Sequence, residues 1–143
     1  MKKDLLYLKK LFSNPFRSVK AGGQTNRNYI VSSQGKKFFV RLPWEGVLDR
    51  KIEGSNILVL SRNKKLKSTL PKYYSYILKK KNILNPKSKE TFNVPDGTVV
   101  AEYIEGREFT VEDFLQKKYQ KCLAKMLCAF HTSGVRLVNT YDV

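Results

Sequence analysis

The pattern of apolar and polar positions alternates between short β-prone runs and longer stretches with helical spacing. Apolar residues at positions 5, 8, 11 and 12 predict a helix over residues 4–12, which Asn14-Pro15 brings to an end. Three β-prone runs follow at 16–21, 27–32 and 36–42, and they are separated by the turn signals Gly22-Gly23 and Gln34-Gly35. We expect these three runs to form an antiparallel meander.

The second half of the chain continues this alternation. A helix is predicted over residues 47–62, weakened at Gly54, because Leu48, Ile52, Ser55 and Val59 share one helical face. Two further β-prone runs, 73–78 and 98–104, flank a polar segment at 79–95 that we expect to be an exposed excursion. A capping pattern at 110–113 precedes a helix over 119–133, and Gly134 provides its stop. The order predicts an α+β fold, with a five-stranded antiparallel sheet, one intervening helix, and helices at both ends.

Length and composition restrict the class of protein. The chain has 143 residues, of which 41% are hydrophobic, and this favours a folded domain over a disordered segment. No apolar run reaches the length of a membrane span, and the basic N-terminus lacks a cleavage site, so we expect a cytoplasmic protein. The two cysteines, Cys122 and Cys128, lie six positions apart on different faces of one predicted helix. We expect them to be small buried residues rather than a disulfide or part of a metal site.

The formal net charge of +16 permits a nucleic-acid partner. The basic residues are scattered along the chain, however, and 21 are lysines against only seven arginines. Arginine is the usual residue for phosphate and base recognition, so this balance favours solvated lysines over a nucleic-acid face. The nucleic-acid alternative rests on interspersed aromatic residues, Tyr73, Tyr74 and Tyr76, on which single-stranded bases could stack.

The stretch from 19 to 42 carries the candidate chemistry. The Gly22-Gly23 turn, with Thr25 and Asn26 beside it, can form a nest of backbone N–H groups for phosphate oxygens. Arg41 ends an otherwise apolar strand and requires a partner, for which Glu53 of the following helix is the candidate. Taken singly, these features are more typical of a wide hairpin turn, a charge at a sheet edge, and a solvated helix charge.

Taken together, the motifs carry a family resemblance. In order they read GGQTNRNYIV, FFVRLP, DRKIEGSNILVL, VVAEYIEG and LAKMLCAFHTSG. This set, over residues 19–134, resembles the N-terminal lobe of the kinase-like fold. Within that fold it resembles the choline/ethanolamine kinase and aminoglycoside phosphotransferase group, and bacterial choline kinases in particular. The resemblance implies a kinase-like N-terminal lobe over residues 1–106. It also implies that residues 107–143 are the helices that follow the hinge and begin a C-terminal lobe.

The resemblance implies an ATP site residue by residue. The loop over the nucleotide phosphates would be Gly22, Gly23, Gln24, Thr25 and Asn26. Arg41 would contact the phosphates, and Glu53 would hold Arg41 through an ion pair. Glu102, Tyr103 and Ile104 would form the hinge that bonds the adenine edge. Val40 and Val100 would flank the adenine ring.

The family's catalytic Asp, its partner Asn and its metal-binding Asp lie beyond the helix that residues 123–133 resemble. No His-x-Asp with a following Asn occurs here, so no catalytic or metal residue is assigned. We expect a chain truncated before the catalytic loop, with the Mg²⁺ ligands in a missing and acidic C-terminal lobe.

The implied reaction is transfer of the ATP γ-phosphate to choline or a similar alcohol. Whether this chain catalyses that reaction stays open. The alternatives are a basic nucleic-acid-binding module and an inactive kinase-like partner domain that docks through exposed apolar residues of the 119–133 helix.

Overall fold

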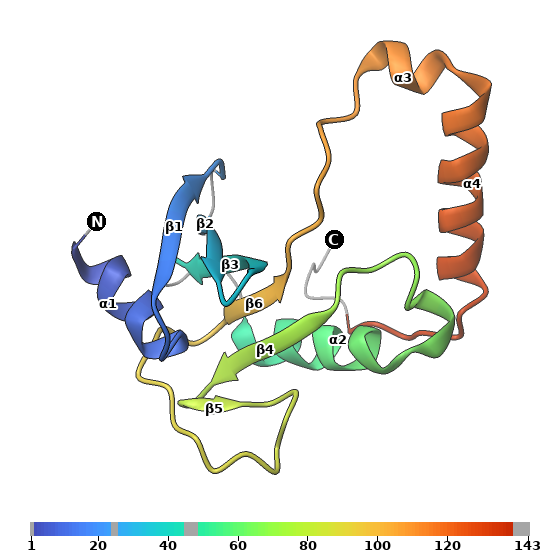
Figure 1. The fold of residues 1–143 in the computed structure, drawn as a ribbon. Coiled ribbons are helices and arrows are strands. Elements are labelled where there is room, and N and C mark those ends of the chain that lie inside the picture. Colours follow the sequence, from blue (N-terminus) through green and yellow to red (C-terminus); the bar gives the residue numbers. More distant parts are fainter. Residues whose placement is uncertain (1, 24–25, 45–48, 139–143) are drawn as a thin grey trace.

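The computed structural model describes residues 2–23, 26–44 and 49–138 (Figure 1). Within these ranges the chain forms four α-helices, one short 3-10 helix and six strands. In chain order they are α1 (Lys2–Leu11), β1 (Phe16–Ala21), β2 (Asn26–Ser33), β3 (Lys36–Pro43), α2 (Arg50–Arg62), η1 (Lys64–Leu66), β4 (Tyr73–Leu78), β5 (Lys81–Asn82), β6 (Thr98–Glu102), α3 (Val111–Leu115) and α4 (Lys117–His131). The predicted α+β class is confirmed. None of the helices in these ranges has the length and apolar character needed to cross a bilayer.

The strands form one antiparallel sheet in the order β1-β2-β3-β6-β4-β5. The predicted meander of β1, β2 and β3 is confirmed, but the described sheet has six strands rather than five. The additional strand, β5, pairs with β4 through a turn in which Lys79 and Lys80 both have positive φ, 49° and 64°. Glycine and asparagine usually occupy such positions, so this segment carries no turn signal and its pattern predicts only an irregular excursion.

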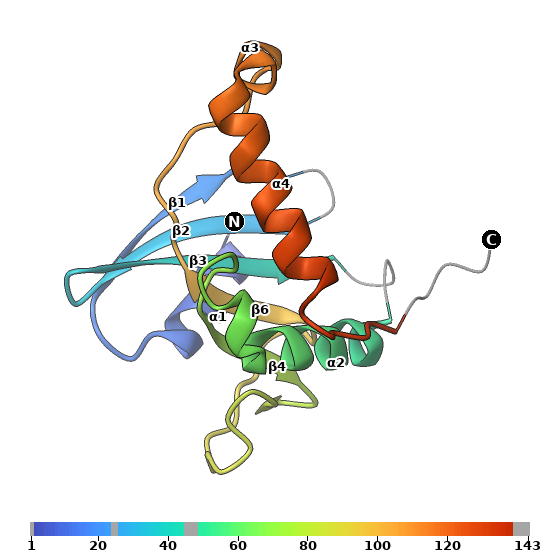
Figure 2. The same ribbon diagram turned by 90° about the vertical axis from the view of Figure 1, so that its right-hand side faces the viewer.

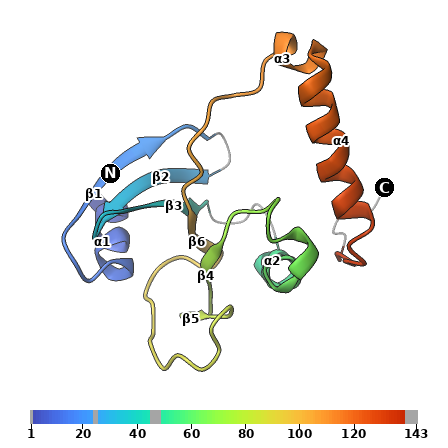
Figure 3. The ribbon, with the colours of Figure 1, turned by 45° about the vertical axis from the view of Figure 1, so that its right-hand side comes forward.

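Helices cover the two faces of the sheet (Figures 1 and 3). On one face α1 contributes Leu8 to an apolar core with Tyr29, Val31, Val40, Leu42 and Val100. On the other face α2 contributes Ile57 to a second core with Tyr76, Val99 and Ala101. Because successive strand residues point to opposite faces, Val99 and Val100 belong to different cores.

An internal polar network attaches α1 to the sheet. Asp4 is buried, and it accepts hydrogen bonds from Arg27 Nη1 at 2.6 Å and from the Tyr29 hydroxyl at 2.7 Å. Burial, reinforced by the bond to Asp4, raises the pKa of Tyr29 to about 12. The Tyr29 hydroxyl therefore stays protonated and remains a donor throughout the physiological pH range. The Asp4–Arg27 ion pair and the Asp4–Tyr29 hydrogen bond thus attach α1 to β2 in addition to apolar packing.

Helix α2 begins where its capping residue dictates. The Asp49 carboxylate accepts hydrogen bonds from the backbone N–H groups of Lys51 and Ile52, so the helix starts at Arg50 rather than at residue 47. The predicted residues 47 and 48 lie outside the described ranges. The buried positions are Gly54 and Ile57, whereas Val59, from the helical face on which the prediction rested, is exposed.

Gly54 explains this orientation of the helix. A Cβ atom added at Gly54 would lie 2.8 Å from Tyr76 Cε1 and 3.0 Å from Ile83 Cδ1. The missing side chain therefore lets α2 lie directly against the Tyr76 ring of β4. Because of this close approach, the helical face with Gly54 and Ile57 packs on the sheet, and the predicted face that contains Val59 does not.

Replacing Gly54 will destabilise the fold, although glycine is ordinarily a poor helix residue. We expect Gly54→Val to lower the free energy of unfolding by about 2 kcal/mol, because the new side chain overpacks the contact with Tyr76. Urea denaturation followed by circular dichroism measures this. Ser55→Ala is the matched control at the next, exposed position, and it should be neutral or slightly stabilising. A Gly54→Val protein as stable as the control would contradict the packing argument.

The last two helices form an arm beside the sheet (Figures 2 and 3). The predicted cap of α3 is confirmed, since Thr110 and Asp113 make both bonds of a capping box. Helix α4 has no buried residue, and Cys122 and Cys128 are exposed, so the prediction that these cysteines are buried was wrong. The arm is attached at its C-terminal end, where Asn63 Nδ2 donates to the Ser133 carbonyl at 3.3 Å.

Candidate functional site

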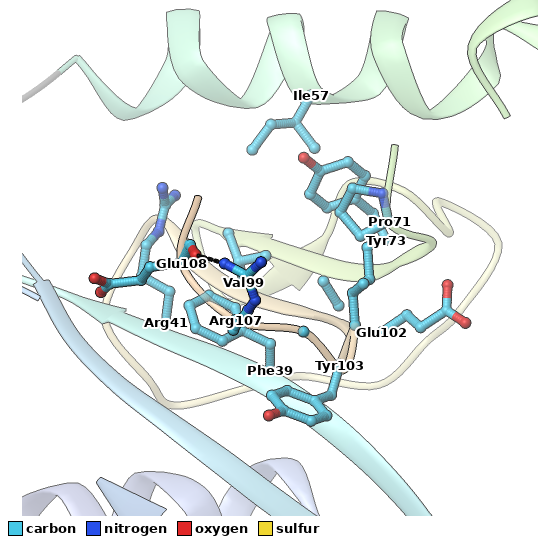
Figure 4. A pocket seen from close by; sticks show the side chains of 13 residues that line it. Phe39, Arg41, Ile57, Pro71, Tyr73, Val99, Glu102, Tyr103, Arg107 and Glu108 are labelled. Carbon is cyan, nitrogen blue, oxygen red and sulfur yellow. Dashed lines mark hydrogen bonds between the residues drawn. The ribbon is translucent and has the colours of Figure 1, made fainter. Parts of the chain in front are cut away.

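A cavity of about 750 Å³ opens on the α2 side of the sheet (Figure 4). It is bounded by strands β3 and β6, by α2, by the residues that precede β4, and by the extended segment that follows β6. A volume of this size accommodates a small organic ligand. The cavity is therefore the place to locate the residues that the sequence singles out.

Alternating side chains of two paired strands form the floor of the cavity. Phe39 and Arg41 come from β3, and Val99 and Ala101 come from β6. The strand register places Phe39 opposite Ala101 and Arg41 opposite Val99, so the four side chains share one face. The floor is thus apolar except at its Arg41 end.

The side of the cavity next to α2 and β4 is also apolar. Figure 4 shows Ile57 pointing from α2 towards Tyr73, and Pro71 lies beside that tyrosine. Burial raises the pKa of Tyr73, so its hydroxyl remains protonated at neutral pH. An apolar slot with a few polar groups at its edge is typical of sites for small organic ligands.

The extended segment after β6 contributes the polar edge. The predicted hinge residues Glu102, Tyr103 and Ile104 all line the cavity, although β6 ends at Glu102, two residues earlier than predicted. The Tyr103 backbone N–H donates to the Lys37 carbonyl at 3.4 Å, and Lys37 Nζ lies 2.6 Å from Glu105 Oε1. These contacts hold the start of the segment against β3.

A second ion pair lies at the far end of this segment. Arg107, which lines the cavity, donates from both terminal nitrogens to the Asp113 carboxylate, with Nη2 to Oδ1 at 2.7 Å. The bonds from Arg107, together with that from the Thr110 backbone, hold the pKa of Asp113 well below its usual range. The rim of the cavity is therefore connected directly to the cap of α3.

The predicted ion pair between Arg41 and Glu53 is present. Arg41 Nη2 lies 2.6 Å from Glu53 Oε1, and the two side chains are only 20% and 16% exposed. Burial alone would raise the pKa of Glu53, but Arg41, with Tyr76 and Arg50, outweighs burial and leaves the pKa below its usual 4.5. Glu53 is therefore ionised at neutral pH and holds the guanidinium at the polar end of the cavity floor.

The predicted phosphate loop is described only in part. Gly22, Gly23 and Asn26 lie at the β1–β2 turn, outside the lining of the cavity, and Gln24 and Thr25 lie outside the described residues. Asn28, which the sequence analysis missed, donates from Nδ2 to the Gly22 carbonyl at 2.8 Å. A Cβ atom at Gly23 would lie 2.3 Å from that Nδ2 atom, so glycine permits the contact. Asn28 pairs with Arg41 across the strands, and the turn therefore lies at the Arg41 end of the sheet.

Two expectations about side chains were wrong. Val40 and Val100, expected to flank an adenine ring, are buried in the core on the α1 face. The neighbouring residues Phe39, Val99 and Ala101 line the cavity instead. The reason is strand parity, because a shift of one residue moves a side chain to the other face of the sheet.

The tyrosines that motivated the nucleic-acid alternative do not form an exposed row. Tyr76 is fully buried and its hydroxyl lies 2.8 Å from Glu53 Oε2, while Tyr73 is half-buried in the cavity wall. Tyr74 points to the other side of the strand, where its ring meets Phe38 with centroids 5.5 Å apart. The three rings therefore do not offer a common stacking platform.

Within the described ranges, no group of three or more His, Cys, Asp or Glu side chains is arranged to hold a metal ion. Comparisons of the chain with protein-family models, with curated proteins and with solved structures each gave no match.

Proposed function

We propose that this chain is the nucleotide-binding lobe of a kinase-like small-molecule phosphotransferase. The observation that carries the proposal is the Arg41–Glu53 ion pair, which places a held guanidinium at the polar end of an apolar slot. In this proposal a flat purine lies against the apolar lining of the cavity, to which Phe39, Ala101 and Tyr73 contribute from the sheet and Ile57 from α2. The phosphates of ATP then extend towards Arg41, whose guanidinium suits their geometry.

In this proposal the backbone of residues 102–104 bonds the adenine edge through groups other than the Glu102 and Tyr103 N–H, which donate to the Lys72 and Lys37 carbonyls. The β1–β2 turn covers the phosphates. The acceptor is choline or a similar small alcohol, which rests on the sequence resemblance alone. Phosphoryl transfer also requires Mg²⁺ and a group that positions the acceptor hydroxyl. We assign neither to this chain, and the proposal places both on a second, C-terminal lobe.

The test is equilibrium binding of ATP to the full chain, with adenosine as a competitor. We expect ATP to bind and adenosine to displace it, because both would occupy the apolar slot. Binding of neither ligand would contradict the proposal. Choline-dependent release of ADP would extend it to catalysis, and its failure would limit the chain to nucleotide binding.

The surface of α4 supports the part of the proposal that concerns a second lobe. Leu123, Met126 and Leu127 are 37%, 47% and 51% exposed, and together they form an apolar stripe. The other side of α4 carries Lys117, Lys118, Lys121 and Lys125, and the helix contains no acidic residue. An acidic catalytic lobe with an apolar contact surface would complement both the stripe and the net charge of +16.

If the stripe is a docking surface, its side chains will be dispensable for folding. We expect Leu127→Asp to change the free energy of unfolding by no more than about 0.5 kcal/mol. The matched comparison is Leu66→Ala in η1, a fully buried leucine whose truncation should cost about 3 kcal/mol. Chemical denaturation of both variants measures the difference. Equal losses would show that the stripe stabilises this chain itself.

A further inference from the structure

Glu53 is shared by two guanidinium groups. Its Oε1 atom pairs with Arg41 Nη2 at 2.6 Å, and its Oε2 atom accepts a hydrogen bond from Arg50 Nη1 at 3.0 Å. All three side chains are at least four-fifths buried, and Arg50 is the most buried of them, with 12% exposure. One carboxylate between two cations leaves this group with a surplus charge of +1.

Arg50 is held in place by main-chain contacts. Its Nη2 donates to the Trp44 carbonyl at 3.0 Å, and the Tyr76 hydroxyl lies 2.8 Å from the Arg50 carbonyl. Its aliphatic stem crosses Gly97, where an added Cβ atom would lie only 2.5 Å from Arg50 Cδ. The bond to Glu53 is therefore part of a built arrangement rather than a chance contact between two long side chains.

Arg41 is less completely satisfied. Its Nη2 atom serves both Glu53 and the Gly97 carbonyl, the latter at 3.4 Å. Its Nε atom is buried and has no hydrogen-bond partner in the described part of the chain, and the same holds for the neighbouring Asn28 Oδ1. A largely buried cation with unused N–H groups is stabilised by an anion, and Arg41 is the member that lines the cavity.

From this geometry we infer that Arg50 is a positioning residue for a polyphosphate-selective site. It holds Glu53 in place beside Arg41, which lines the cavity, and the surplus positive charge of these three side chains favours polyphosphate anions over uncharged ligands. This inference rests on the proposed function only in placing the phosphates at Arg41. It predicts that Arg50 affects phosphate binding without touching the phosphates.

The test uses the full chain and three probes: inorganic tripolyphosphate, ATP and adenosine. We expect Arg50→Gln to weaken the binding of tripolyphosphate and ATP by about tenfold, because Glu53 then competes fully for Arg41. Adenosine affinity should be unchanged, which a merely structural role of Arg50 would not predict. The matched control is Arg62→Gln, which removes the same charge from the exposed end of α2, far from Glu53 in sequence. Arg50→Lys keeps the charge but loses the planar fork, and it should give an intermediate loss.

The outcomes separate this inference from the proposed function. The inference is wrong, even when ATP binds, in either of two cases. In the first, Arg50→Gln and Arg62→Gln weaken tripolyphosphate binding equally, and in the second, Arg50→Gln weakens adenosine binding as much as ATP binding. If tripolyphosphate binds in an Arg50-dependent manner but ATP binds no better than tripolyphosphate, the inference stands and the nucleotide proposal fails. A thermal unfolding curve of Arg50→Gln establishes that the variant is folded. If Arg50→Gln does not fold, the Arg50→Lys variant provides the test. A tripolyphosphate affinity of Arg50→Lys equal to that of the unmodified chain overturns the inference.

Discussion

Arg41→Gln is expected to weaken ATP binding by about a hundredfold, or about 3 kcal/mol, while the protein remains folded. The variant removes the Arg41 guanidinium from the cavity floor, so the phosphates lose a charge-assisted pair in a largely buried setting. Stability should fall much less, because Arg50 and Tyr76 still hold the Glu53 carboxylate. Isothermal titration with ATP and thermal unfolding of the same sample measure the two effects.

The matched control for this prediction is Arg17→Gln on β1, which removes an exposed arginine and should leave ATP affinity within about twofold. The affinity for adenosine should hold in both variants, since the slot itself is intact. If Arg41→Gln bound ATP as tightly as Arg17→Gln does, Arg41 would not be a phosphate ligand, and the observation that carries the proposed function would lose its meaning.

Glu53→Gln is expected to lower the free energy of unfolding by about 3 kcal/mol at pH 7. The substitution keeps the shape of the side chain but leaves two mostly buried guanidiniums without a counter-charge. Breaking such a group by removing its single anion is far more costly than losing an exposed pair. Urea denaturation measures the loss, and Glu90→Gln, in the exposed excursion, is the control that should be neutral.

The pH dependence gives this prediction a second readout. The pKa of Glu53 in the folded protein is below 4.5, so the unfolded chain takes up the proton first. The stabilisation is therefore fully present above about pH 4.5 and is lost as the pH falls through the lower folded-state pKa. The difference in the free energy of unfolding between the unmodified protein and Glu53→Gln should therefore decrease as the pH falls from about 4.5 through the folded-state pKa of Glu53. A gap that stays constant down to pH 3 would mean that the ion pair does not stabilise the fold.

The elements were predictable where local chemistry and tertiary structure agree. The β-prone run before Gly22-Gly23 predicted β1 at its observed bounds, and the aromatic and apolar run 73–78 predicted β4 at its observed bounds. The capping box of α3 was also visible in the sequence. The short strand β5 was not, because lysines occupy its positive-φ turn. Helical spacing predicted the apolar stripe of α4, but spacing alone does not reveal that the described chain leaves this stripe uncovered.

The candidate site was predictable in its charges but not in its walls. Arg41, Glu53 and residues 102–104 were found from residue type and order, and all lie at or beside the cavity. The apolar residues were misplaced by one position, although Arg41 itself fixes the strand parity and points to Phe39 two residues earlier. Arg50 was also detectable in principle, since it lies three positions before Glu53 on the same helix.

Gly97 has a consequence for how the importance of single positions is judged. It has a φ of +85° and leaves the space through which the Arg50 stem passes. In a mutational scan of the whole chain, this position would score as intolerant as Arg50 itself, although glycine brings no reactive group. A map of intolerant positions alone would thus mark a residue whose contribution is empty space.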